Sequence, residues 1–560
     1  MPAPISRRTF LKTGLAALTV AGNVMPTACS RRHFDLVIKD GFIVDGTGGP
    51  AWKADLGIKG DSIAALGNID PEQGHRVIPA SGLHVCPGFI DIHSHSDNTI
   101  LSCPTAESRV FQGVTTEITG NCGFSVVPLA GIDADKRRLQ LQEEENIQVD
   151  LSDVASYFAL LEETGISVNL ALLVGQGTLR QNAIGLENRQ LSADELKAVV
   201  RALEETLDQG AIGLSTGLEY VPGSYTPAGE IAALTSIVAG RGGLYATHIR
   251  NEAASLLGAI GEAVDIGRQT GVRVEISHLK ASGKPNWDKQ ASALDLIETA
   301  RSSGIEIMAD AYPYTAYSTS LTFFLAPWVQ EGGAEAIVGR ILDREKRSRI
   351  RREVDNVVLV DPGGYDLIVI IQVKTEKNGW VIGKNLVEIG EVWKIEPADA
   401  LLRLLEEEET GVEFVGYGMQ PENVEMVLSH PLVMIGSDGA SMSPKGKAAQ
   451  SRPHPRSYGT YPLVLGHYVR ERGILDLPTA IKKMTGMPAD HLGLTDRGRI
   501  SRRMKADLVV FDAAAVRNTA TFDTPHQYPV GMKYILVNGV LVVENGKHTG
   551  ARPGKVLRKA

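Results

Sequence analysis

Strand-like apolar segments alternate with helix-like stretches over most of this chain, beginning at Gly88. Between several of them, apolar residues recur at helical spacing, as in Ala193–Leu207 and Ala253–Arg268. Eight strands joined by helices predict an α/β fold, a TIM-like (β/α)8 barrel whose functional site forms at the carboxyl ends of the strands. The expected strands are Gly88–His95, Thr115–Thr119, Ser167–Val174, Ala211–Ser215, Gly243–His248, Arg273–His278, Glu306–Ala311 and Leu432–Ser437.

Short β-rich segments with turn residues lie on both sides of this pattern. They are Phe34–Gly46, Ala54–Leu66, Ala506–Asp512 and Tyr534–Val543. We expect both ends of the chain, residues 33–86 and 495–550, to build one small β-sandwich beside the barrel of residues 87–494. The chain between the seventh and eighth barrel strands is much longer than a single helical crossover needs, which predicts an inserted subdomain at residues 320–425.

Composition is that of a soluble globular protein, with 43% hydrophobic and 22% charged residues. A net charge of -9 and the lack of a basic block after the first 30 residues argue against nucleic acid as a partner. The four cysteines are irregularly spaced and do not form a disulfide framework, so at least one is free to be a metal ligand.

The amino terminus, residues 1–30, is expected to be a targeting segment. Ser6-Arg-Arg-Thr-Phe-Leu-Lys12 resembles the twin-arginine export signal, and the uncharged stretch after it is too short and too mild for a membrane-spanning helix. We therefore expect an exported protein, periplasmic through the twin-arginine route, without a membrane span. Pro26-Thr-Ala-Cys29 is a weak lipobox, which makes Cys29 a candidate lipid anchor.

The first barrel segment changes abruptly from apolar to metal-binding residues, in Gly88-Phe-Ile-Asp-Ile-His-Ser-His-Ser-Asp97. On a strand, alternate residues share a face, so Asp91, His93, His95 and Asp97 are expected to point the same way. Two imidazoles at i and i+2 can reach one metal ion. The alternative for an isolated His-x-His is a polar strand end that meets solvent.

Four further strand ends carry potential ligands. Cys122 lies in a glycine-flanked loop after the second strand, where it is either a thiolate ligand or a small buried hydrophobe. Thr247-His-Ile-Arg250 and Ser277-His-Leu-Lys280 repeat one pattern, a histidine followed two places later by a cation. Asp438 stands in a glycine-bracketed turn after the last strand, where it is either a turn former or a ligand and proton carrier.

Together these motifs resemble the amidohydrolase superfamily and, within it, the D-aminoacylases (N-acyl-D-amino-acid deacylases). The cysteine of Gly120-Asn-Cys-Gly123 singles out that branch, because hydantoinases and dihydroorotases bridge two metals with a carbamylated lysine. No lysine occurs in the third or fourth expected strand. Asp310–Ala316 and Arg452–Arg456 match the same family, and the resemblance runs from about Phe34 to Lys547.

The resemblance implies a zinc-dependent hydrolase that cleaves the amide bond of N-acyl-D-amino acids and releases a carboxylic acid and a D-amino acid. It implies one tightly bound Zn²⁺ and a second, weaker position, with a metal-activated water as nucleophile. The implied ligands are Cys122, His248 and His278 for the tight zinc, and His93, His95 and Asp438 for the second position, with Cys122 shared. Asp438 is also the implied acid/base. The implied residues around the substrate's α-carboxylate are Lys280, Tyr312 and Arg456, with Ser318 as a neighbour.

Two departures and three rival functions remain open at this stage. Gly175-Gln-Gly177 lies where the family commonly has Gly-His-Gly, and Ser501-Arg-Arg-Met504 replaces a common proline-glycine turn. The rivals are a cyclic amidase, a D-dipeptidase and a non-catalytic, metal-bearing periplasmic binding protein. The sequence leaves open the acyl group, the side chain of the small-molecule substrate, the number of metals and the oligomeric state.

Overall fold

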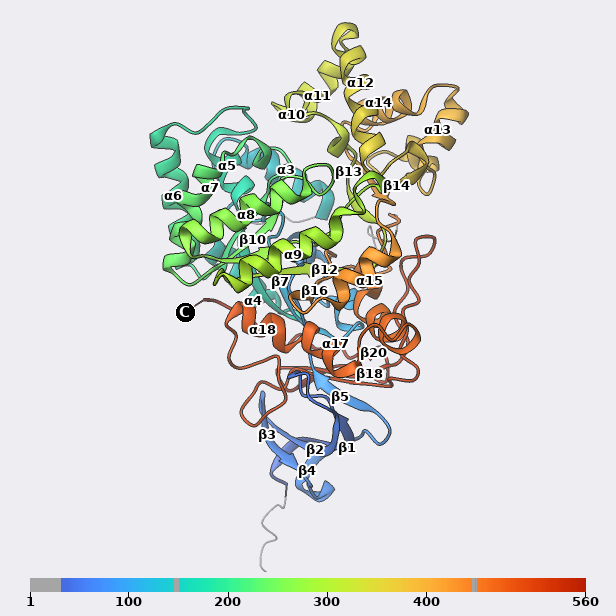
Figure 1. Ribbon diagram of the computed structural model, residues 1–560. Coiled ribbons are helices and arrows are strands. Elements are labelled where there is room, and N and C mark those ends of the chain that lie inside the picture. The colour runs from blue at the N-terminus through green and yellow to red at the C-terminus, as the bar shows by residue number, and fades with distance from the viewer. Residues whose placement is uncertain (1–31, 146–150, 446–448, 450, 560) are drawn as a thin grey trace, which may run out of the picture.

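The computed structural model describes residues 32–145, 151–445, 449 and 451–559, so the targeting segment and Cys29 lie outside the described residues. Its centre is a sheet of eight strands that follow one another in chain order and pair in parallel (Figure 1). These strands are β6 (Phe89–Asp91), β7 (Val114–Thr119), β8 (Asn169–Gly175), β9 (Gly213–Gly217), β10 (Leu244–His248), β11 (Arg273–Ile276), β12 (Ile307–Ala311) and β16 (Val433–Ile435). Each overlaps one of the eight strands expected from sequence, and the barrel prediction is confirmed.

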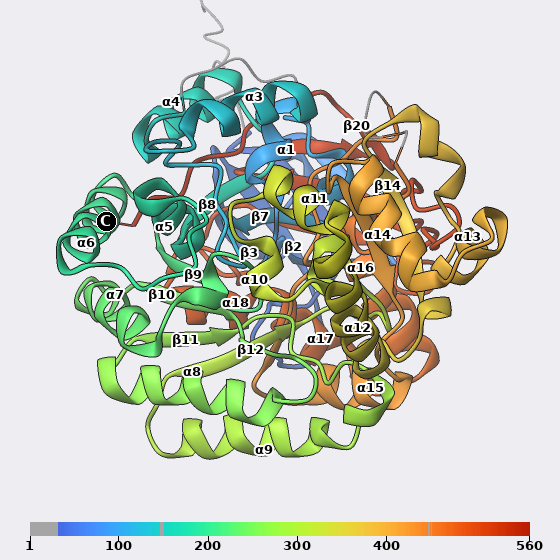
Figure 2. The same ribbon diagram turned by 90° about the horizontal axis from the view of Figure 1, so that it is seen from above.

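The ring is closed beyond the ends of its first and last strands. An isolated parallel bridge joins Ser94 to Gly439, just after β6 and β16. Helices surround the strands, as Figure 2 shows from above. They are α4 (Val154–Thr164), α5 (Gln176–Ile184), α6 (Ala193–Asp208), α7 (Ala228–Gly240), α8 (Leu256–Thr270), α9 (Lys289–Ser302), α15 (Pro421–Ser429) and α17 (Leu477–Met484). The carboxyl ends of all eight strands therefore meet at one mouth.

The first strand is shorter than expected. β6 ends at Asp91, and α1 (Ser96–Ser102) begins directly after His95. The expectation that Asp91, His93, His95 and Asp97 share one face of a strand is thus wrong. Buried polar partners bend the chain out of the strand after Asp91. The hydroxyls of Ser94 and Ser96 both donate to Glu117 Oε1 at 2.7 Å. His93 and His95 consequently reach the mouth from a turn.

Strands from both ends of the chain join in one nine-stranded sheet below the barrel in Figure 1. The amino-terminal strands are β1 (Phe34–Ile43), β2 (Trp52–Lys59), β3 (Ser62–Gly67), β4 (Gly74–Pro79) and β5 (His84–Pro87). The carboxyl-terminal strands are β17 (Leu508–Phe511), β18 (Met532–Val537), β19 (Val540–Glu544) and β20 (Lys547–His548). The two groups meet where β5 pairs antiparallel with β17. One buried apolar cluster contains residues from both ends, including Ile38, Val85 and Leu508.

A separate subdomain follows β12 and stands over the carboxyl ends of the strands (Figure 1). Its three-stranded sheet has the order β13 (Tyr317–Ser320), β15 (Val412–Gly416), β14 (Ile368–Val373). Its helices are α10 (Pro327–Gln330), α11 (Ala334–Leu342), α12 (Arg344–Val360), α13 (Leu386–Trp393) and α14 (Pro397–Glu407). Because this segment leaves and re-enters the barrel at the mouth, it adds walls to any site there.

Four more α-helices of the described residues lie outside these groups. They are α2 (Glu107–Val110), α3 (Ala134–Glu145), α16 (Arg456–Leu463) and α18 (Gly486–Leu492). None of the helices in the described residues combines the length and the apolar character that crossing a bilayer requires.

Candidate metal centre and substrate site

The six ligand candidates from the sequence gather at the barrel mouth, each at or just after the end of a strand. They are His93 and His95 after β6, Cys122 after β7, His248 at the end of β10, His278 after β11 and Asp438 after β16. All are buried except His95, whose side chain is 36% exposed. Three of them, Cys122, His278 and Asp438, have positive φ angles of 53°, 34° and 51°. Non-glycine residues rarely adopt this conformation, and such backbone strain clusters at functional sites.

The donor atoms of these residues converge closely enough to bind metal. Cys122 Sγ lies 3.4 Å from both His93 Nε2 and His278 Nε2. His248 Nδ1 lies 3.0 Å from His278 Nε2, and His95 Nε2 lies 2.9 Å from Asp438 Oδ1. Donors of His93, Cys122, His278 and Asp438 all fall within 4.8 Å of one another. A thiolate, imidazoles and a carboxylate are the ligand types that zinc prefers, so the residues fit this metal.

Each of the three buried histidines of this set also contacts a carboxylate with its other ring nitrogen. The pairs are His93 Nδ1 with Asp310 (3.1 Å), His278 Nδ1 with Glu252 (2.9 Å) and His248 Nε2 with Glu219 (3.1 Å). This arrangement fixes the tautomer and ring orientation of a metal-binding histidine. The sequence motifs gave no expected role to these three carboxylates. Their position in the sequence could have indicated such a role, since all three lie in or just after a barrel strand.

Electrostatics favour the thiolate and the carboxylate at the centre. Burial alone would raise the pKa of Cys122, but the neighbouring His93 and His278 hold the pKa of this thiol well below its usual range. Burial would likewise raise the pKa of Asp438, but the Arg456 guanidinium holds it well below the usual value. Both shifts favour the deprotonated form that a metal requires.

Cations expected to hold the substrate carboxylate lie beside the ligands and are paired with protein carboxylates. Lys280 Nζ contacts both oxygens of Glu252 at 2.6 Å, and Arg456 Nη1 contacts Asp438 Oδ2 at 2.5 Å. The Tyr312 ring lies between them, 5.7 Å from Lys280 Nζ and 5.2 Å from the Arg456 guanidinium carbon. Its buried hydroxyl has no hydrogen-bond partner among the described residues. A buried orphan hydroxyl beside two cations suits an anionic ligand.

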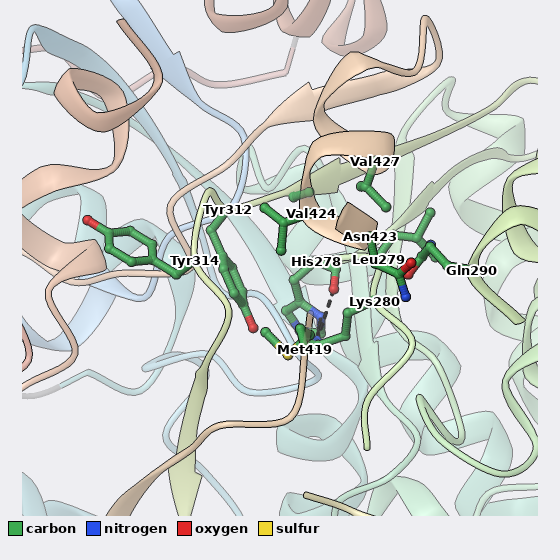
Figure 3. Close-up of a pocket in the computed structure, with 11 residues that line it drawn as sticks. His278, Leu279, Lys280, Gln290, Tyr312, Tyr314, Met419, Asn423, Val424 and Val427 are labelled. Atoms are coloured by element: carbon green, nitrogen blue, oxygen red, sulfur yellow. Dashed lines mark hydrogen bonds between the residues drawn. The ribbon is translucent and has the colours of Figure 1, made fainter. Parts of the chain in front are cut away.

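Two adjoining cavities open at this point. The first, with about 310 Å³ of empty volume, is mostly apolar, and Figure 3 shows the Tyr312 ring pointing toward His278 and Lys280 at its edge. The second, with about 300 Å³, shares those three residues and is also lined by the ligand candidates His248 and Asp438. The residues that line the second cavity are Tyr220, His248, Glu252, His278, Lys280, Tyr312, Tyr317, Ser318, Thr319, Phe323, Asp361 and Asp438. Ser318 thus lines the site, and its carbonyl oxygen accepts from Arg456 Nη2 at 3.3 Å.

Gln176, which stands where the family commonly has histidine, is buried at the start of α5. Its side-chain amide donates to Thr226 Oγ1 at 3.0 Å and to Glu230 Oε1 at 3.4 Å. Because these contacts connect α5 to the chain after β9, Gln176 supports packing beside the mouth.

An eight-stranded parallel barrel with cysteine, histidine and carboxylate side chains gathered at its mouth matches the architecture of the amidohydrolases, and the comparisons with known proteins place the chain in that class. The family model described as "Amidohydrolase family" matches residues 417–543. The D-aminoacylase of Alcaligenes xylosoxydans xylosoxydans is 35% identical over 531 residues, which cover 94% of this chain and 98% of that protein. The N-acyl-D-glutamate deacylase of the same organism is 35% identical over 529 residues, covering 94% and 97%.

A solved structure shares the whole architecture. The N-acyl-D-glutamate deacylase from Bordetella bronchiseptica, complexed with zinc and a phosphonate inhibitor that mimics the tetrahedral intermediate, superposes with a TM-score of 0.79 at 33% identity. The match covers 94% of this chain and 99% of that one. The chain therefore belongs to the D-aminoacylase (N-acyl-D-amino-acid deacylase) family.

Proposed function

We propose that this protein is a zinc-dependent deacylase that hydrolyses N-acyl-D-amino acids to a carboxylic acid and a D-amino acid. The observation that carries the proposal is the convergence of a cysteine–histidine–aspartate cluster with Lys280, Arg456 and Tyr312 in adjoining space. The cluster suits amide hydrolysis, and the cations suit a substrate with a free carboxylate. Family membership supports both halves of this assignment.

The proposed ligands divide between two positions. Cys122, His248 and His278 would hold the tight zinc, whereas His93, His95 and Asp438 would form a second, weaker position that shares Cys122. Zinc held by these residues would polarise the acyl carbonyl and lower the pKa of a water molecule toward neutrality. The carboxylates behind the histidines would keep the rings oriented for this purpose.

Asp438 is the proposed acid/base. Its carboxylate lies among the ligand histidines, 2.9 Å from His95 Nε2 and 3.5 Å from His93 Nε2, and it is ionised. It would accept a proton from the attacking water and then deliver it to the amine that leaves. The same carboxylate contacts Arg456, so acid/base and substrate-binding groups are directly coupled.

The substrate's α-carboxylate is proposed to bind Arg456, Lys280 and Tyr312, with Ser318 beside them. A guanidinium can hold a carboxylate through two parallel hydrogen bonds, which fixes orientation as well as position. The unpartnered Tyr312 hydroxyl supplies another donor. Holding this end of the substrate would place the scissile amide at the metal ligands, where orientation lowers the barrier.

A single experiment tests the activity. The purified protein is analysed for metal and assayed for acid release from matched N-acetyl-D- and N-acetyl-L-amino acids, with hydantoins and D-dipeptides as comparison substrates. We expect zinc in the protein and release from the D-series only. Equal rates on both enantiomers would contradict the D-specific assignment, and binding without release would indicate a binding protein instead.

We further infer that the protein is exported to the periplasm through the twin-arginine route. The support is Ser6-Arg-Arg-Thr-Phe-Leu-Lys12, and this route carries folded proteins, so metal would be loaded before export. Replacing Arg7 and Arg8 together by lysine should retain the protein in the cytoplasm. Unchanged export of that variant would rule out the route, and lipid labelling that depends on Cys29 would show an anchor.

A further inference from the structure

The side chain that this protein accepts on its substrate is not decided by overall similarity. By their names, one relative acts on N-acyl-D-glutamate and another is a D-aminoacylase, and both are 35% identical to this chain. We therefore attribute this selectivity to the residues that line the second cavity.

Asp361 brings a carboxylate into that cavity from the inserted subdomain. It lies directly after α12, which stands above the barrel in Figure 1, and it is only 5% exposed. Its Oδ1 accepts two hydrogen bonds, from Ser282 Oγ at 2.6 Å and from the Tyr317 hydroxyl at 2.9 Å. In the described part of the chain, Oδ2 has no hydrogen-bond partner and no ion pair involves Asp361. A carboxylate oxygen that has no protein donor and belongs to a cavity-lining residue can accept a hydrogen bond from a ligand.

The two partners of Asp361 place it beside the amino-acid half of the substrate. Ser282 lies two residues after Lys280 on the loop that follows β11. Tyr317 directly precedes Ser318, whose carbonyl oxygen accepts from Arg456. The segments that carry the carboxylate-binding groups therefore also hold Asp361. Because the substrate's α-carbon carries both the α-carboxylate and the side chain, a side chain whose α-carboxylate is held by these groups would come near Asp361.

Asp361 is ionised at mildly alkaline pH. Burial raises the pKa of its carboxyl to about 7, with Glu219 and Glu252 adding to the effect and Ser282 and Tyr317 opposing it. Above pH 7 the group is mostly ionised, so a substrate carboxylate beside it would be repelled, whereas an amide N–H or an ammonium group would be attracted.

We propose that Asp361 selects the substrate's side chain: the protein prefers N-acyl-D-amino acids whose side chain ends in a hydrogen-bond donor or a positive charge, such as D-glutamine or D-lysine, and discriminates against D-glutamate and D-aspartate. This inference rests on the proposed deacylase function.

The test compares two nearly isosteric substrates. We measure kcat/KM for N-acetyl-D-glutamine and N-acetyl-D-glutamate at pH 8 with the zinc-loaded wild type, Asp361→Asn and Asp366→Asn. Asp366 is an exposed aspartate five residues further along the same segment, so its variant removes the same charge outside the cavity. Asparagine at 361 keeps an acceptor for Ser282 and Tyr317. The glutamine-to-glutamate ratio within one variant cancels any difference in the amount of folded protein.

We expect the wild type and Asp366→Asn to prefer the glutamine substrate by at least about tenfold, and Asp361→Asn to lose most of that preference. A wild-type ratio near or below 1 overturns the inference without need of any variant, and so does an unchanged ratio in Asp361→Asn. N-Acetyl- and N-succinyl-D-leucine form a further arm: a shift in their ratio alone would place Asp361 beside the acyl group and overturn the assignment. If no N-acyl-D-amino acid is cleaved, the proposed function has failed instead.

Discussion

Glu252 offers the sharpest test of how the metal centre is built. Its Oε1 lies 2.9 Å from His278 Nδ1, and both of its oxygens contact Lys280 Nζ at 2.6 Å. Its contacts are to a ligand histidine and to a substrate-binding cation, so we regard it as a positioning residue. In Glu252→Gln the side chain keeps its shape and one acceptor oxygen but loses its charge.

Two losses follow from the contacts. Removing the carboxylate behind a metal-binding histidine typically costs 10–100-fold in affinity, about 1.4–2.7 kcal/mol. Burial disfavours the charged form of Lys280, but the surrounding acidic groups, Glu252 foremost, together raise the lysine's pKa. Without the Glu252 charge, the Lys280 ammonium is buried with no opposite charge in contact, which also lowers the stability of the fold. A 2.9 Å hydrogen bond from Lys280 Nζ to the His278 carbonyl oxygen limits this loss.

Zinc affinity is measured by competition with a chromophoric chelator, and Tm is measured on the metal-free and zinc-loaded protein. Glu262→Gln is the matched control, because Glu262 pairs with Arg250 at 2.8 Å on the same side of the barrel and does not contact His278. We expect a 10–100-fold weaker zinc affinity for Glu252→Gln and wild-type affinity for the control. A change of less than about threefold in Glu252→Gln would refute the reasoning.

Three further predictions address catalysis, ligand roles and backbone strain. Asp438→Asn should retain zinc by metal analysis yet lose at least about a hundredfold in turnover; near-normal turnover would remove Asp438 from the acid/base role. His93→Ala should reduce binding of a second metal equivalent more than the first, whereas Cys122→Ala should weaken both, and the reverse pattern in a zinc titration would contradict the proposed division. Gly120→Ala should lower the free energy of unfolding by more than about 1 kcal/mol in urea, because φ is +74° and the added Cβ would lie 2.0 Å from a β8 carbonyl oxygen. The control Gly258→Ala, in a helix with open space around the new Cβ, should be neutral or stabilising.

Sequence patterns located the eight barrel strands and the ligand types because both follow from local spacing. A strand needs a short apolar run, and barrel topology then brings every strand's carboxyl end to one mouth. Cys122, His248 and Asp438 could thus be assigned to one region although they lie far apart in the chain. Local spacing did not predict where the first strand stops, since Ser94 and Ser96 leave the strand to reach Glu117, a residue of the next strand.

The sequence by itself determined the barrel, its family and the set of residues that can bind metal and a carboxylate. The tertiary structure decided which carboxylates stand behind the histidines, that Arg456 contacts Asp438, and that Asp361 reaches the cavity from the inserted subdomain. The reason is physical. The type of ligand that a side chain can offer follows from the residue's identity. The partner of a residue such as Asp361, which lies far from Ser282 in the sequence, is decided only when the folded chain brings buried polar groups together.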